Sequence, residues 1–150
     1  MVFLLFSIVV FIIVALFASK KLPRHELYAI ALFSIVLGFS TDITLDLKYD
    51  FYGYFKTGVD FAGFLPILFI FPTSGVLFMN LFPFRQPIGK QLLYLLGWTV
   101  FSLIFEYLSI ASGYFYHNGW NYWLSAVTYP FLLLFQLLHL KILRVYLGSD

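Results

Sequence analysis

The chain contains no cysteine and few charges. Without cysteine there are no disulfide bonds, catalytic thiolates, cysteine-ligated zinc sites or iron–sulfur clusters. Charged residues make up 11% of the 150 residues, whereas a soluble domain carries roughly a quarter. A chain with so little charge has too little polar surface for a soluble catalytic domain.

Strong positive charge and enzyme motifs are also missing. The net charge of +2 comes without a basic run outside the expected loops, so we expect no nucleic-acid partner. No glycine-rich phosphate loop, His-x-x-x-His pair or Gly-x-Ser-x-Gly elbow occurs. His25-Glu26 matches a zinc-protease motif over two letters only and falls in an expected inner loop. The sequence therefore favours a non-enzymatic protein and predicts no metal site and no cofactor.

Hydrophobic residues, in contrast, make up 62% of the chain and fall into long runs. About 20 helical residues at ~1.5 Å each cross the ~30 Å hydrocarbon layer of a bilayer. We therefore predict an all-α fold, a polytopic bundle of five transmembrane helices that forms one membrane domain over residues 1–150. The expected spans are residues 2–18, 27–45, 61–82, 92–111 and 123–143.

Basic residues orient these spans. They follow the first apolar run instead of preceding it, which is typical of a retained anchor and not of a cleaved signal peptide. With the N-terminus outside and the C-terminus in the cytoplasm, seven basic residues lie inside and two outside, as the positive-inside rule requires. The inner residues are Lys20, Lys21, Arg24, Arg85, Lys90, Lys141 and Arg144, and the outer ones are Lys48 and Lys56.

Glu106 lies deep in the apolar run of residues 92–111. A charge at such depth costs at least ~2.5–3.5 kcal/mol, so the carboxylate needs a partner, a proton or water. The best partners are Ser or Tyr hydroxyls of the second, third and fifth spans, because no Lys or Arg lies at the same depth. Glu106 is the first candidate for a functional residue, and the alternative is a structural hydrogen bond between helices.

Other polar residues recur at helical spacing and so share helix faces. Small residues on such faces let helices approach closely, which predicts that these faces point into the bundle. The faces are Ser34, Gly38, Asp42 and Asp46 in the second span, Ser102, Glu106, Ser109 and Gly113 in the fourth, and Ser125, Tyr129, Gln136 and His139 in the fifth.

Several acidic residues fall toward the outer ends of the spans and predict an outward-open acidic vestibule. Asp42, Asp46, Asp60 and His117 join Glu106 as candidates for binding a ligand or a proton. Each of these four residues also has a simpler, structural explanation. Asp42 and Asp46 fit a solvated helix end, Asp60 fits the first turn of a helix, and His117 fits a turn.

The two outer loops are rich in aromatic residues, which the preference of Tyr and Trp for the membrane interface explains. A lid over an outward cavity or a docking surface is the alternative. The residues are Tyr49, Phe51, Tyr52, Tyr54 and Phe55 in one loop and Tyr114, Phe115, Tyr116, Trp120, Tyr122 and Trp123 in the other.

Several residues form a recognisable pattern over residues 59–145: Asp60 before a proline-broken span, Phe105-Glu106-Tyr107, Tyr116, Gly119-Trp120, Trp123 and Ser125. This pattern resembles a family of small, uncharacterised multi-pass membrane proteins from spore-forming Gram-positive bacteria. The resemblance implies a bundle of four or five helices in a bacterial cytoplasmic membrane, and it implies no catalytic residues.

Three functions remain open. The favoured one is an integral membrane protein whose outward acidic pocket binds a cation, proton or polar ligand, as a transporter-like unit or as a subunit of a membrane assembly. The second is a purely structural partner of another protein or of a second copy of this chain. The third is an intramembrane enzyme that acts on a lipid or isoprenoid substrate, with Glu106 and Asp42 as acid and base.

Overall fold

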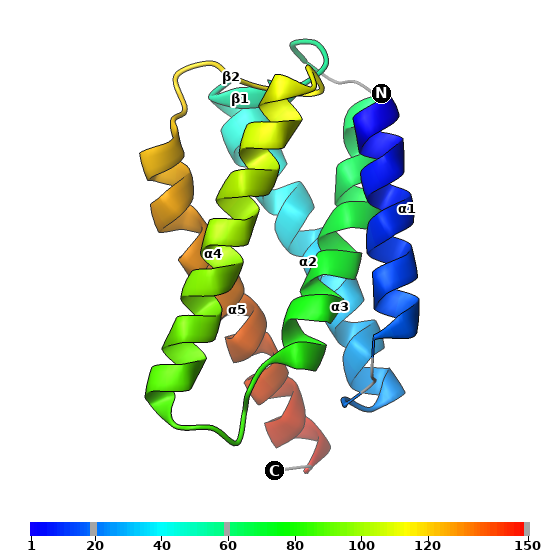
Figure 1. Ribbon diagram of the computed structural model, residues 1–150, viewed down its shortest axis with the longest axis vertical. Coiled ribbons are helices and arrows are strands. Elements are labelled where there is room, and N and C mark those ends of the chain that lie inside the picture. Colours follow the sequence, from blue (N-terminus) through cyan, green and yellow to red (C-terminus); the bar gives the residue numbers. More distant parts are fainter. Residues whose placement is uncertain (19–20, 59–60, 149–150) are drawn as a thin grey trace.

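A computed structural model describes residues 1–18, 21–58 and 61–148 of the chain. Within these residues the fold is mostly helical, with five α-helices and one small two-stranded sheet (Figure 1). The helices are α1 (Val2–Phe17), α2 (Arg24–Asp42), α3 (Phe71–Leu81), α4 (Ile88–Ala111) and α5 (Tyr122–Leu147), and the strands are β1 (Tyr52–Tyr54) and β2 (Phe115–His117).

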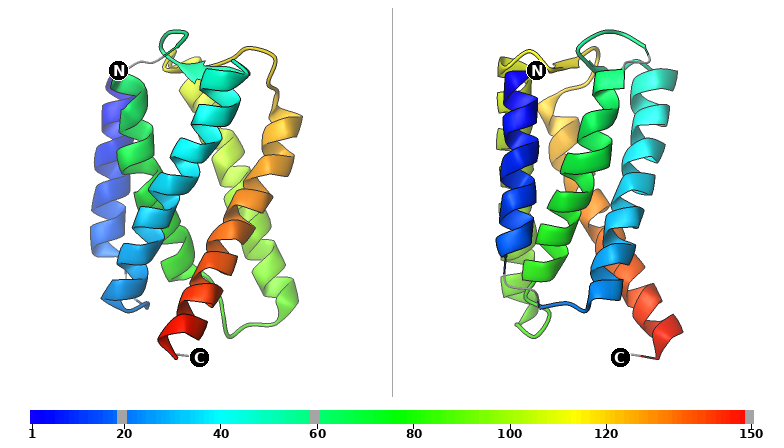
Figure 2. Two further views of the ribbon diagram at one scale, coloured as in Figure 1. Left: turned by 180° about the vertical axis from the view of Figure 1, so that it is seen from behind. Right: turned by 90° about the vertical axis from the view of Figure 1, so that its right-hand side faces the viewer.

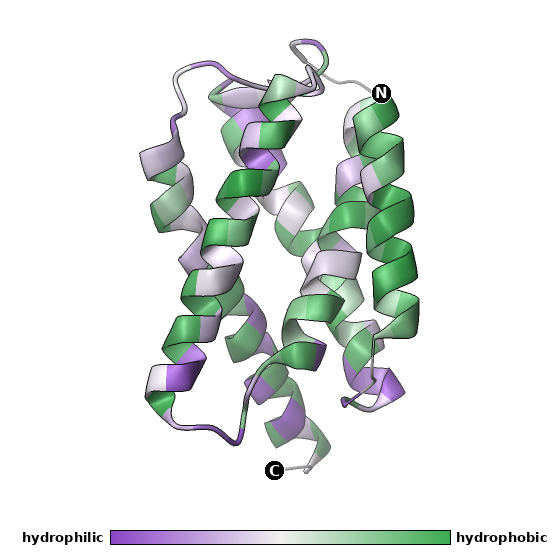
Figure 3. Cartoon of the chain, in the orientation of Figure 1, coloured by the Kyte–Doolittle hydropathy of each residue, from purple (hydrophilic) through white to green (hydrophobic). Residues whose placement is uncertain are grey.

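Four helical segments are long and apolar enough to cross a membrane, which makes this the architecture of a multi-pass membrane protein. Their outward faces carry large apolar side chains, and the most hydrophilic residues lie mainly toward the two ends of the bundle (Figure 3). The fifth helix, α1, has 16 residues and is about 24 Å long, so it is shorter than the usual span. The four segments are Arg24–Lys48, Phe61–Leu81, Ile88–Ala111 and Tyr122–Leu147.

Two of these segments contain a π-helical stretch. α2 continues into η1 (Ile43–Lys48), and η3 (Pro66–Ile70) leads into α3. At the end of η3 the N–H group of Phe71 donates to the carbonyl of Pro66, five residues earlier, which is the hydrogen bond of a π-helix. Short π-helical segments occur frequently at functional sites. Residues of both stretches line a small cavity of about 40 Å³.

α2 and α3 pack closely because two glycines remove side chains from their contact. A Cβ atom at Gly38 would overlap the ring of Phe71, and a Cβ atom at Gly75 would overlap the hydroxyl of Ser34. The buried residues of α2 repeat every four positions, so one face of this helix points into the bundle. These residues are Glu26, Ile30, Ser34, Gly38 and Asp42.

α1 lies at the edge of the bundle and packs on η3 and α3 (Figure 2). Its buried side chains Leu4, Ile8 and Phe11 join Ile70 and Tyr114 in one apolar cluster. A second cluster, nearer the opposite end, joins α2, α3 and α5. Its buried members are Leu22, Ile30, Phe78, Met79, Phe82 and Leu140.

The two aromatic loops pair with each other to form the antiparallel ribbon β1–β2. Tyr52 pairs with His117, Gly53 with Tyr116 and Tyr54 with Phe115. Our expectation of helices alone was therefore wrong at this point. Backbone pairing between the loops buries the two β1 tyrosines against the bundle, which sequence periodicity within the helices could not show.

The position of Glu26 also differs from our expectation. The sequence analysis placed it in an inner loop, but α2 already begins at Arg24, after Pro23, and buries Glu26 in its first turn. The side chain is 2% exposed and binds Arg144 of α5 through two hydrogen bonds, Nε–Oε1 at 2.8 Å and Nη2–Oε2 at 2.9 Å. This pair joins α2 to α5 at the end opposite the ribbon.

Candidate functional site

Glu106 lies on the inner face of α4 and is 3% exposed. Its Oε1 atom accepts a hydrogen bond from Ser125 Oγ at 2.7 Å and lies 2.6 Å from His117 Nε2. Its Oε2 atom accepts a hydrogen bond from the Tyr129 hydroxyl at 2.8 Å. The expected pairing of Glu106 with Ser and Tyr hydroxyls of another span is therefore confirmed, with α5 as that span.

The start of α5 explains how two of these donors reach Glu106. The side chain of Asn121 accepts a hydrogen bond from the Leu124 N–H at 3.0 Å and caps the helix. Ser125 and Tyr129 then follow at a spacing of four residues, on one face. Trp120 Nε1 donates to Ser125 Oγ at 2.8 Å, so the serine hydroxyl is oriented to donate its own proton to Glu106.

Asp42 lies at the end of α2 and is 6% exposed. Tyr52 donates to Oδ1 at 2.8 Å, and Tyr54 donates to Oδ2 at 3.0 Å. Burial, reinforced by the Asp42 carboxyl, raises the pKa of both tyrosines, so both hydroxyls keep their protons and remain donors. No ion pair to Asp42 occurs within the described parts of the chain.

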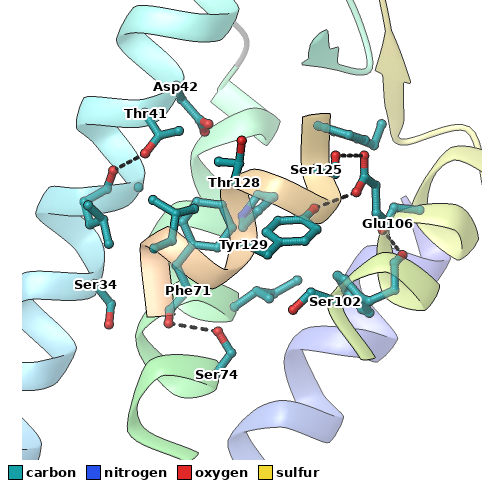
Figure 4. A pocket seen from close by; sticks show the side chains of 18 of the residues that line it. Ser34, Thr41, Asp42, Phe71, Ser74, Ser102, Glu106, Ser125, Thr128 and Tyr129 are labelled. Atoms are coloured by element: carbon teal, nitrogen blue, oxygen red, sulfur yellow. Dashed lines mark hydrogen bonds between the residues drawn. The ribbon is translucent and has the colours of Figure 1, made fainter. Parts of the chain in front are cut away.

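Asp42 and Glu106 both line one cavity of about 230 Å³ between the helices. Figure 4 shows Asp42 on the α2 side and Glu106 on the α4 side, with Tyr129 of α5 between them and directed toward Glu106. Most of the remaining wall is apolar and aromatic, with rings from α1, α3 and α4 and from the ribbon. The cavity therefore combines two carboxyl groups with an aromatic wall.

Ser34 and Gln136 line the same cavity at positions farther from the ribbon. Gln136 Nε2 donates to Ser34 Oγ at 2.7 Å, and Ser34 Oγ donates to the Ile30 carbonyl at 2.8 Å. Gln136 is 6% exposed, and its Oε1 atom has no hydrogen-bond partner.

The other candidates from the sequence are placed differently. Asp46 is buried and lines the smaller cavity beside η1, not the larger one. Ser102 is half-buried on the wall of the larger cavity. Ser109 is buried and hydrogen-bonds to the Phe105 carbonyl and the Tyr114 hydroxyl. Asp60 lies outside the described residues.

His117 lies on β2 instead of in an isolated turn, and its contact with Glu106 ties the ribbon to α4. Sequence reasoning missed the two tyrosine partners of Asp42. The alternation in Tyr52-Gly53-Tyr54 was the available signal, because residues two apart in a strand point to the same face.

No group of three or more His, Asp or Glu side chains that could hold a metal ion occurs in the part of the chain that the structure describes. No protein-family model, curated protein or solved structure matches the sequence. The chemistry of the cavity is therefore the basis for a functional proposal.

Proposed function

We propose that this protein binds a cation, a proton or a polar ligand in the cavity between Asp42 and Glu106. In this proposal all five helices cross a bacterial cytoplasmic membrane, with the N-terminus outside and the C-terminus in the cytoplasm. The cavity then faces the outer side, and the protein acts as a transporter-like unit or as a subunit of a membrane assembly.

The observation that carries the proposal is the unequal environment of the two carboxyl groups. Glu106 has a basic neighbour, His117, at 2.6 Å, whereas the hydrogen-bond partners of Asp42 are two neutral tyrosines. A carboxylate buried at membrane depth is costly unless something compensates its charge. A bound proton or cation at Asp42 supplies that compensation.

The charge distribution supports the orientation. Lys48 and Lys56 belong to the end that carries the ribbon, whereas six other described basic residues belong to the opposite end. The positive-inside rule places the more basic end in the cytoplasm. The six residues are Lys21, Arg24, Arg85, Lys90, Lys141 and Arg144.

Infrared difference spectroscopy of the protein in lipid nanodiscs tests the proposal. Spectra are recorded while pH, Na⁺ or K⁺ is varied, for the parent and for Asp42→Asn. We expect a carboxyl band that responds to at least one of these changes and disappears in Asp42→Asn. Asp50→Asn, in an exposed loop position, is the control and keeps the band. A parent spectrum without such a band would overturn the proposal.

The hydrogen bonds at Glu106 favour a second candidate, a structural role for that residue. They join α4, β2 and α5, as expected of a group that holds helices together. If the role is structural, Glu106→Gln lowers the melting temperature and leaves the Asp42 band unchanged. If Glu106 belongs to the binding site, the same variant shifts the response of the Asp42 band.

A further inference from the structure

The end of the bundle opposite the ribbon carries exposed basic side chains from three segments of the chain. These segments are the start of α2 with the residues before it, the loop from α3 into α4 with the first turn of α4, and the last part of α5. Hydrophilic residues of these segments lie at that end in Figure 3. We call the set the basic surface, and it consists of Lys21, Arg24, Arg85, Lys90 and Lys141.

No acidic side chain balances the basic surface within the described residues. Glu26 is the one described acid at this end, and both of its carboxylate oxygens are bound to Arg144. None of the five basic side chains forms an ion pair with a described residue. Asp150 lies outside the described residues. The described part of this end therefore keeps a strong net positive charge.

Contacts between the segments fix the basic surface. Arg144 of α5 binds Glu26 of α2 and also lies over the ring of Phe84, 4.9 Å from its centroid, in the loop before α4. At the end of α3, Asn80 Oδ1 accepts a hydrogen bond from the N–H group of Lys21 at 2.7 Å. All three segments are thus held to the bundle before any partner binds. A surface held in this way loses little conformational entropy on binding.

Helix length places the basic surface at the level of the lipid headgroups. From Tyr122 to Lys141, α5 rises by about 29 Å, and from Lys90 to Ala111, α4 rises by about 32 Å. The hydrocarbon layer of a bilayer is ~30 Å thick. With these two helices across the membrane, both lysines lie where the phosphate groups of the lipids are.

The chemistry of this end matches an anion that carries apolar chains. The guanidinium groups of Arg24 and Arg85 can each bind two phosphate oxygens, and a lysine ammonium group binds phosphate as a point charge. Exposed apolar side chains of α4 and α5 follow directly toward the middle of the bundle. They are Leu92, Leu93, Leu138 and Ile142. A phospholipid contacts both parts, whereas a free phosphate contacts only the basic one.

We propose that the basic surface binds the phosphate groups of anionic phospholipids, whose acyl chains lie along the outward faces of α4 and α5. Arg24 and Arg85 are the principal contacts, because they lie on the two segments that Arg144 joins. In the orientation proposed above, these lipids belong to the cytoplasmic leaflet. The inference does not depend on the ligand of Asp42, which lies toward the other end of the bundle.

Native mass spectrometry of the detergent-solubilised protein tests the inference. The protein is titrated with dioleoylphosphatidylglycerol, which is anionic, and with dioleoylphosphatidylcholine, which has the same chains and no net charge. We expect the anionic lipid to bind at least about tenfold more tightly, because each basic residue near a headgroup contributes roughly a fivefold factor. Equal affinities for the two lipids would overturn the inference.

Two double variants, each of which removes two positive charges, locate the binding surface. Arg24→Gln/Arg85→Gln should weaken phosphatidylglycerol binding about tenfold or more and leave phosphatidylcholine binding unchanged. Lys48→Gln/Lys56→Gln, at exposed positions of the ribbon end, is the matched control. It should change either affinity less than about twofold, because the two ends lie roughly 30 Å apart, several Debye lengths at 0.1 M salt. An equal loss in both double variants would contradict the proposed surface.

A conservative variant separates the loss of charge from a defect in folding. Arg24→Lys/Arg85→Lys keeps both charges and should bind phosphatidylglycerol within about threefold of the parent. A loss as large as that of the glutamine variant would contradict the contact. Glycerol 3-phosphate has a phosphate group without acyl chains, and at the concentration of the lipid it should not displace phosphatidylglycerol. Displacement would assign the surface to free phosphate compounds and overturn the inference.

Discussion

At the scale of single residues, Asp42 shows how a carboxyl group is held in an apolar bundle without a basic partner among the described residues. Each of its oxygens accepts a hydrogen bond from one tyrosine, and the two tyrosines sit on the same face of one short strand. The position of the carboxyl group thus depends on a strand that lies outside the helices.

Removing either tyrosine hydroxyl should destabilise the protein. Tyr52→Phe and Tyr54→Phe each leave one buried Asp42 oxygen without its donor, which we expect to lower the free energy of unfolding by about 1–3 kcal/mol. Tyr49→Phe is the matched control, because this tyrosine is exposed on the same loop. Denaturant unfolding in a defined detergent measures the differences. Equal stability of all three variants would contradict the assigned hydrogen bonds.

Because the hydroxyl of Tyr114 is buried, we expect the folded protein to lose stability at alkaline pH. Burial raises the pKa of its hydroxyl to about 12, against an ordinary value of 10.0. The folded protein therefore holds this proton more tightly than the unfolded chain does. The contribution of this proton to the free energy of unfolding is fully present below pH 10 and is lost between about pH 10 and 12. Over that range the free energy of unfolding falls by up to ~1.4 kcal/mol per pH unit.

Unfolding measured from pH 8 to pH 11 checks this expectation. Stability should fall above pH 10 in the parent, and the fall should be smaller in Tyr114→Phe, which has no proton to lose. Tyr107→Phe, on the exposed face of α4, should follow the parent curve. A Tyr114→Phe curve that is parallel to the parent curve would argue against the buried hydroxyl.

At the scale of elements, the close packing of α2 on α3 depends on Gly38. Gly38→Leu must displace the Phe71 ring, and we expect a loss of about 1–3 kcal/mol from overpacking. Gly97→Leu on α4 is the matched control, because nothing lies within 4 Å of a Cβ atom there. Thermal melting in detergent compares them. If Gly38→Leu melts with the control, the two helices do not pack as described.

The helices were easier to predict than their connections. The apolar runs located all five α-helices, because span length follows from bilayer thickness. Their ends shifted by a few residues, and that shift moved Glu26 from a loop into α2. Glu106 stood out because a carboxyl group is rare inside an apolar run. The sequence also predicted Ser or Tyr hydroxyls as its partners, but it did not decide which span supplies them.

The rest of the site depends on contacts that helical periodicity does not encode. The pairing of β1 with β2 joins loops separated by more than fifty residues, and it decides where Tyr52, Tyr54 and His117 lie. The bond from Gln136 to Ser34 likewise depends on which faces of α2 and α5 meet. These long-range contacts are set by packing of the whole bundle.

At the scale of the whole molecule, the two ends of the bundle differ in charge, which predicts their sides of the membrane. Because the chain has no cysteine, Lys56→Cys and Arg85→Cys each introduce a single thiol at an exposed position. An impermeant maleimide applied to intact cells should label Lys56→Cys. Arg85→Cys should be labelled only after the membrane is permeabilised. The opposite pattern would invert the proposed orientation.

The position of α1 at the edge of the bundle has a consequence for biosynthesis. α1 packs on η3 and α3, which the ribosome makes some fifty residues later. In the proposed topology of five spans, α1 therefore lies in the bilayer before its partners are made. It can do so because Ser7 is its only polar residue, so nearly all of its side chains are stable in contact with lipid. In that topology, assembly of the bundle follows membrane insertion, and α3 packs on a helix that is already in the membrane.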